Sequence, residues 1–149
     1  MTDIGFYHLT RTPLERALPR LLEKVVAAGM RAVVVAGSAD RVEALNGALW
    51  TYDPGSFLPH GSARDGNAAD QPIWLTDADD NPNAATMLVL VDGATSPRLA
   101  AYQRCLDLFD GNDPDAVAAA RARWTVAKAA GHGLTYWQQT ESGGWQSKA

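Results

Sequence analysis

The apolar positions in the first quarter of the chain predict a strand, a helix and a second strand. Ile4 to Leu9 has the β-favouring and apolar side chains of a short strand. Thr12 is expected to cap a helix that has Pro13 in its first turn and ends at Gly29. The inner face of that helix follows three- and four-residue steps: Leu14, Leu18, Leu21, Leu22 and Val25. The continuous apolar run from residue 31 to 36 predicts a strand buried on both faces, and therefore a parallel one.

The remaining pattern predicts further helices and strands in alternation. Ser38 is expected to cap a second helix, with Val42, Leu45 and Leu49 facing inward. Residues 72–76 and 86–91 are predicted strands, residues 99–109 a third helix, and residues 113–130 a fourth helix that ends at Gly131. An edge strand is expected from residue 133, with a frayed tail after about residue 140, and residues 61–83 are expected to include a mobile acidic loop. The order predicts one domain over residues 1–149, an α/β three-layer Rossmann-like sandwich whose mostly parallel sheet is flanked by helices.

Composition limits the class of protein further. The 149 residues are 46% hydrophobic and 20% charged, which excludes a disordered protein. No apolar run is long enough to span a bilayer and no leader pattern starts the chain, so a cytoplasmic protein without membrane contact is expected. The only cysteine, Cys105, excludes an internal disulfide and is expected to be a buried thiol on the third helix. The net charge of -4 does not favour direct DNA binding.

Catalytic and cofactor motifs are missing from the sequence. The turn after the second strand has only Gly37 where a dinucleotide fingerprint needs three spaced glycines, and no Walker lysine follows it. The histidines His8, His60 and His132 have no metal-ligand spacing, and a solvated turn explains the carboxylates around Asp79. We therefore expect no metal, no cofactor and no catalysis. A nucleotide- or small-ligand-binding enzyme of the Rossmann-like class is the alternative, based on the fold alone.

A loop rich in aromatic residues runs from Leu49 to His60. Proline and glycine interrupt its backbone, yet it contains Trp50, Tyr52 and Phe57. Large apolar side chains on a loop either fold back over the core or anchor another protein. A contact between two copies of this chain is a further possibility.

The last predicted helix has a tryptophan between two cations. At 100° per residue Ala119, Ala122, Val126 and Ala130 share one face, which is expected to lie against the sheet. Val117, Arg121, Trp124 and Lys128 share the opposite face, on which Trp124 is expected to be largely exposed. One interpretation is a shallow apolar pocket with a cationic rim, suited to an acidic peptide. The other is that Trp124 packs on the tail or on a neighbouring helix while the cations cover its edge.

These features together resemble the chi subunit family of bacterial DNA polymerase III. The resemblance runs through Phe6-Tyr7-His8-Leu9, Leu45-Asn46-Gly47-Ala48-Leu49-Trp50, Ser56-Phe57-Leu58-Pro59-His60, Pro72-Ile73-Trp74-Leu75 and Ala120-Arg121-Ala122-Arg123-Trp124. It implies a non-catalytic clamp-loader accessory protein whose fold has no working nucleotide site. Two partners are implied: the acidic C-terminal tail of single-stranded DNA-binding protein, and the psi subunit or an equivalent of the clamp loader, so that contact with DNA is indirect.

The resemblance also implies roles for individual residues. Tail binding is expected at Val117, Arg121, Trp124, Thr125 and Lys128, and psi or partner binding at Trp50, Phe57, Leu58 and Pro59. Positions that are often basic in the family are Val117 and Thr125 here, so the rim of the pocket is less positive. Tail binding is therefore expected to be weaker or to rely on Arg16, Arg20 or Arg123 instead.

Overall fold

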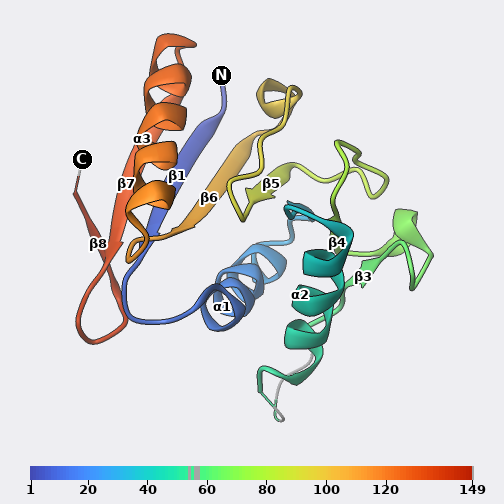
Figure 1. Cartoon of the computed structure of the whole chain (residues 1–149). Helices are drawn as coiled ribbons and strands as arrows, with labels where there is room; N and C mark the ends of the chain where they lie inside the picture. The colour runs from blue at the N-terminus through green and yellow to red at the C-terminus, as the bar shows by residue number, and fades with distance from the viewer. Residues whose placement is uncertain (54, 56–57, 149) are drawn as a thin grey trace.

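A computed structural model describes residues 1–53, 55 and 58–148 of the chain (Figure 1). Its strands are β1 (Asp3–Leu9), β2 (Ala32–Val35), β3 (Gly61–Ser62), β4 (Ile73–Thr76), β5 (Met87–Leu90), β6 (Arg104–Asp110), β7 (Gly133–Gln139) and β8 (Trp145–Ser147). Its α-helices are α1 (Leu14–Ala27), α2 (Ala39–Thr51) and α3 (Pro114–Ala129), and short 3-10 turns occupy Ala68–Asp70 and Leu99–Ala101.

The strands of the described chain form one sheet in the order β3-β4-β2-β5-β6-β1-β7-β8. All neighbouring pairs are parallel except β7 and β8. One apolar cluster lies between the sheet and helices α1 and α2, and a second includes the inner residues of α3. Helices therefore cover both faces of the sheet, and the predicted three-layer α/β class with a mostly parallel sheet is confirmed.

The helices α1 and α2 bury the faces that their apolar spacing predicts. In α2 the Ser38 hydroxyl accepts a hydrogen bond from the Arg41 amide, and Val42, Leu45 and Leu49 are buried. In α1 the residues from Leu18 to Val25 on the inner face are buried, and Leu14 is half-buried. The predicted cap of α1 is wrong: Pro13 holds the N-cap position, and the Thr12 hydroxyl instead accepts from Gln139 at 2.7 Å.

The prediction of a helix over residues 99–109 is wrong. Only a short 3-10 turn forms at Leu99–Ala101, and the rest of the segment is β6, a central strand that pairs in parallel with both β1 and β5. Every residue from Cys105 to Phe109 is buried, a pattern that one face of a helix cannot produce. Cys105 is therefore a buried thiol on a strand, and burial raises the pKa of this thiol.

The C-terminal part adds helix α3 and two strands, β7 beside β1 and β8 beside β7. Helix α3 and strand β7 confirm the predicted last helix and the strand after it: Asp113 caps α3, and Gly131 follows it at a positive φ of 85°. The expectation of a frayed tail after about residue 140 is wrong for residues 145–147, which form β8. Figure 1 shows β8 beside β7 at the edge of the sheet, and the Trp145 ring of β8 lies 5.0 Å from that of Tyr7 on β1.

Residues 61–83 include regular elements as well as turns. β3 and the 3-10 turn at Ala68–Asp70 precede β4, and the Asp65 carboxylate accepts hydrogen bonds from Asn46 and from the Ser62 amide. The hydrogen bond from Ser62 is the main cause of the lowered pKa of Asp65. The mobility of this segment stays a prediction.

Candidate functional site

The face that helix α3 turns toward the sheet differs from the predicted one. Ala120 and Ala127 are buried, and Val117 and Trp124 are half-buried against the sheet. The residues predicted to face inward, Ala119, Ala122, Val126 and Ala130, are exposed, with Val126 at 70%. Alanine occurs all around this helix, so its apolar pattern does not distinguish the faces, and the packing of the large Trp124 ring decides the orientation.

Trp124 packs on β1 and β7. Its ring lies 5.3 Å from Phe6 and 6.0 Å from Tyr136, both in edge-on geometry. The expectation that Trp124 is largely exposed is therefore wrong, and its packing on the C-terminal strand corresponds to the second interpretation. The half-buried Trp124 side chain remains partly accessible. Beside it, α3 exposes Arg121, Thr125 and Lys128, while Val117 lies half-buried one turn before Arg121.

Arg121 lies close to two further side chains that the sequence did not single out for this surface. Its positive charge influences the pKa values of both His8 on β1 and Tyr136 on β7. The Tyr136 hydroxyl faces Nδ1 of His8, and both rings contact Phe109. We call the surface formed by Val117, Arg121, Trp124, Lys128, His8 and Tyr136 the α3–β7 surface.

Three cations that were expected to compensate for the less positive rim lie elsewhere. Arg123 is only 15% exposed and forms two hydrogen bonds with the buried Asp107 carboxylate, at 2.7 and 2.9 Å. Arg16 and Arg20 are on α1, which covers the opposite face of the sheet from α3. Thr125 donates its hydroxyl to the Arg121 carbonyl at 3.1 Å. The charge of the α3–β7 surface therefore depends on Arg121 and Lys128.

The second predicted surface lies at the end of α2, and the structure describes part of it. Trp50 is 52% exposed and its ring lies 4.6 Å from that of the buried His60. Pro59 is half-buried, whereas Phe57 lies outside the described residues. Leu58 is buried in the core next to α1 and α2, which corrects its assignment to a contact surface. Trp50 and Pro59 are thus the described residues that a partner can reach.

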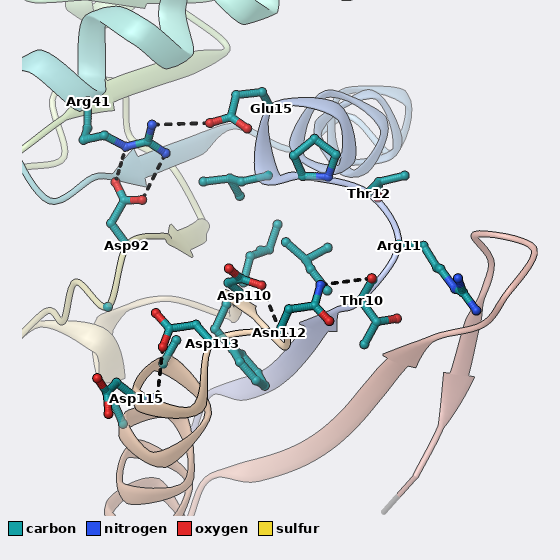
Figure 2. Close-up of a pocket in the computed structure, with 18 of the residues that line it drawn as sticks. Thr10, Arg11, Thr12, Glu15, Arg41, Asp92, Asp110, Asn112, Asp113 and Asp115 are labelled. Carbon is teal, nitrogen blue, oxygen red and sulfur yellow. Dashed lines mark hydrogen bonds and ion pairs between the residues drawn. The ribbon is translucent and has the colours of Figure 1, made fainter.

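A cleft of about 720 Å³ opens at the carboxyl ends of β1, β5 and β6 (Figure 2). In open α/β sheets, ligands usually bind outside the carboxyl ends of the strands. The N-termini of α1 and α3 and the Arg41 side chain of α2 complete its walls. The cleft is therefore where the alternative function, a nucleotide- or small-ligand-binding enzyme, has to be tested.

The loop between β1 and α1 forms a place where an anion could bind, and a side chain of the protein itself, Gln139, fills it. The Gln139 Oε1 atom accepts hydrogen bonds from three consecutive amides, those of Thr10 at 3.3 Å, Arg11 at 2.8 Å and Thr12 at 3.0 Å. Successive amides that converge in this way form a nest, which in nucleotide-binding proteins receives a phosphate oxygen. Gln139 is buried, so this nest is closed to a ligand.

The corresponding position between β2 and α2 is also filled. The Gly37 amide donates to Asp92 Oδ2 at 3.2 Å. Arg41 binds both oxygens of the Asp92 carboxylate at 3.1 Å, and Figure 2 shows its guanidinium between Asp92 and Glu15. A carboxylate thus occupies the place near the helix N-terminus where a phosphate would bind. The sequence gives no signal for Asp92 or Gln139, because Asp92 lies in the turn after β5 and Gln139 on β7, both distant along the chain from the amides they bind.

The charges that line the cleft also oppose a phosphate. They comprise the carboxylates of Glu15, Asp92, Asp110, Asp113 and Asp115 and the guanidinium groups of Arg11, Arg41 and Arg123. Arg41 and Arg123 are engaged with carboxylates, as described above. Negative charge is in excess, so the cleft repels a polyphosphate. Within the described part of the chain, no group of three or more His, Cys, Asp and Glu side chains is arranged to hold a metal ion.

Fold and cleft together define a class: a three-layer α/β protein with a mostly parallel sheet, whose own side chains fill the positions at the carboxyl ends of the strands where a phosphate could bind. The family model described as DNA polymerase III chi subunit, HolC, matches residues 1–135. The chain belongs to this family, which supports a role in DNA replication.

A curated relative agrees with this assignment. The chain is 32% identical over 109 residues to the probable DNA polymerase III subunit chi of Rickettsia prowazekii (strain Madrid E). The match covers 73% of this chain and 66% of the Rickettsia protein, just under two thirds of its length. Family membership therefore also confirms the resemblance that the sequence motifs indicated. In the described part of the chain, no helix combines the length and apolar character needed to cross a membrane.

Proposed function

We propose that this protein is a non-catalytic accessory subunit that connects the clamp loader of DNA polymerase III to single-stranded DNA-binding protein. It acts in the cytoplasm as a single domain over residues 1–149. It recognises the acidic C-terminal tail of the binding protein rather than DNA, so its contact with DNA is indirect. Membership of the chi family supports this function at the level of the polymerase complex.

The α3–β7 surface carries the proposal of tail binding. Arg121 and Lys128 are exposed two turns apart on α3 and flank the half-buried Trp124, one turn before it and one turn after it. Carboxylates of an acidic tail would pair with the two cations, while an apolar or aromatic residue of the tail would contact Trp124 and Val117. Thr125 lies between the cations and adds no charge. The attraction is electrostatic and acts between solvent-exposed groups, so the affinity for the tail should fall as the salt concentration rises.

The end of α2 is the second part of the proposed adaptor. Trp50 is the largest exposed aromatic side chain of the described residues there, and Pro59 lies half-buried in the same chain segment. Together with Phe57 they are proposed to bind psi or an equivalent clamp-loader subunit. Trp50 is on α2, which covers the opposite face of the sheet from α3. The two partners could therefore bind at the same time.

Isothermal titration calorimetry with a synthetic peptide of the last ten residues of the cognate single-stranded DNA-binding protein tests tail binding. Arg121→Ala and Trp124→Phe are each expected to weaken the affinity at least several-fold, which corresponds to about 1 kcal/mol or more. Arg16→Ala is the matched control, because it removes an exposed arginine from the other face of the sheet. If both α3 variants bind like the wild type, the assignment is wrong. An effect of Arg16→Ala alone would move the site to α1.

Thermal shift with a panel of nucleotides tests the alternative enzyme function. A ligand at 100 times its dissociation constant adds about 2.7 kcal/mol to the free energy of unfolding. We expect no shift, because Asp92 and Gln139 occupy the positions that phosphates need. A reproducible increase in melting temperature with one nucleotide would favour the alternative.

A further inference from the structure

His8 is held firmly at the base of the α3–β7 surface. Its ring lies 5.1 Å from Phe109 and 5.8 Å from Tyr136. It also lies directly over Gly111, where an added Cβ atom would be 1.9 Å from its Cδ2 atom. A glycine at this position is therefore required for the imidazole to reach its place. The position of His8 is fixed by three strands and the turn that follows β6.

Polar and charged groups face His8 from every element around it. The Tyr136 hydroxyl comes from β7, the Arg121 guanidinium from α3, and the Asp110 carboxylate and Gly111 backbone from the end of β6. Partial burial is the main reason that the pKa of His8 is lowered. Arg121 lowers it further, while the Gly111 backbone and Asp110 act in the opposite direction. The lowered pKa favours the neutral imidazole form of His8, which lies beside the cation that is proposed to bind the peptide.

We propose that His8 and Tyr136 belong to the anion-recognition surface, and that His8 takes up a proton when an acidic peptide binds beside Arg121. This inference rests on the proposed function. A carboxylate of the peptide would neutralise the charge of Arg121 and add a negative charge near the ring, and both changes favour the imidazolium form. The proton comes from the solvent. Because a tyrosine hydroxyl can donate to Nδ1 or accept from it, Tyr136 suits both forms of His8.

Proton uptake and peptide affinity are linked in both directions. If the bound peptide raises the proton affinity of His8 by some factor, protonation of His8 raises the affinity for the peptide by the same factor, so lower pH favours binding. One peptide carboxylate several ångströms from the partly exposed His8 ring should make the affinity for the peptide about three- to tenfold higher at pH 6 than at pH 8. The carboxylates of the peptide stay ionised over this range, since their ordinary pKa values are about 4. Tighter binding at pH 6 therefore has to come from a group of the protein that takes up a proton in this range.

Calorimetry with the ten-residue tail peptide at pH 6, 7 and 8 tests the proposal. Each titration is repeated in two buffers of different ionisation enthalpy, so that proton uptake is measured directly. In parallel, proton NMR of the His8 ring follows its titration midpoint with and without peptide. His8→Gln removes the titrating group but keeps a polar side chain. His132→Gln is the control, because His132 is half-buried beyond the C-terminal end of α3 and its Nδ1 already accepts from the Thr2 amide at 3.0 Å.

The expected result is an about three- to tenfold tighter complex at pH 6 than at pH 8, with proton uptake on binding and an upward shift of the His8 midpoint. His8→Gln should abolish the pH effect, and His132→Gln should keep it. Binding that does not change with pH, or an unchanged His8 midpoint in the wild-type protein, overturns the inference and leaves the proposed function standing. If the peptide does not bind at any pH, the proposed function fails, and this inference fails with it.

Discussion

Replacing Arg123 by Met should destabilise the protein strongly, because it leaves a charge without a partner inside the fold. The Asp107 side chain is 4% exposed and lies on the central strand β6, in register with Phe6 on β1 and Leu90 on β5. The two bonds from Arg123, at 2.7 and 2.9 Å, are its polar contacts among the described residues. Breaking a buried pair by removing one partner costs about 3–5 kcal/mol. For a domain of this size, that lowers the melting temperature by roughly 6–20 °C.

The predicted loss depends on pH in a specific direction. Burial raises the pKa of Asp107, while Arg123 lowers it, so removal of Arg123 raises it further. A carboxyl group with a raised pKa in the folded state binds more protons when folded than when unfolded. Its contribution to stability is therefore most favourable below the unfolded pKa and is lost as the pH rises through the folded pKa. The deficit of Arg123→Met should be largest at pH 7–8 and should shrink toward pH 4.

Urea unfolding followed by tryptophan fluorescence measures these differences. Arg121→Met, two residues earlier on the same helix, is exposed and should change the free energy of unfolding by no more than about 0.5 kcal/mol. The double variant Asp107→Leu with Arg123→Met should recover most of the loss, because two apolar groups of similar size can replace a buried pair. A loss below about 1 kcal/mol at pH 7.5, or a deficit that does not shrink on acidification, would refute the reasoning.

Two further changes test contacts at the carboxyl ends of β6 and β7. Gly111→Ala should lower stability by about 1–3 kcal/mol in a thermal melt, because the added Cβ would overlap His8. Gly47→Ala on α2 is the control: its Cβ meets no atom within 4 Å, so the change should be neutral or slightly stabilising. Equal melting temperatures for the two variants would contradict this prediction. Gln139→Ala removes the acceptor of three amides and should cost about 1–3 kcal/mol in urea unfolding, while Gln138→Ala on the same strand should cost no more than about 0.5 kcal/mol.

Several local features followed from the sequence because their cause is local. Val33 and Val34 lie in a continuous apolar run, which only a strand buried on both faces can satisfy. Ser38 and Asp113 cap helices through their own side chains, so three or four residues suffice to predict the helix starts. The family motifs are likewise read from short segments. These signals were enough for the fold class and the family.

The errors came from segments whose neighbours decide their structure. Residues 104–110 have apolar side chains that suit either a helix or a strand, and the buried Asp107 among them finds its partner, Arg123, only on α3. Trp145 lies in a glycine-containing tail that predicted fraying, but its packing on Tyr7 holds β8 in place. In each case the stabilising group is distant in sequence, so no local pattern shows it.

By itself, the sequence determined the layered α/β class, the buried parallel strands, the family, and the residues on which the two binding surfaces are proposed. Only the tertiary structure decided that Trp124 packs on Phe6 and Tyr136, that Leu58 is buried, and that His8 lies beside Arg121. The same holds for the cleft, where Asp92 and Gln139 fill the phosphate positions. The physical reason is range: capping and apolar periodicity act within a few residues, whereas side-chain packing and charge pairing join residues that only the folded chain brings together.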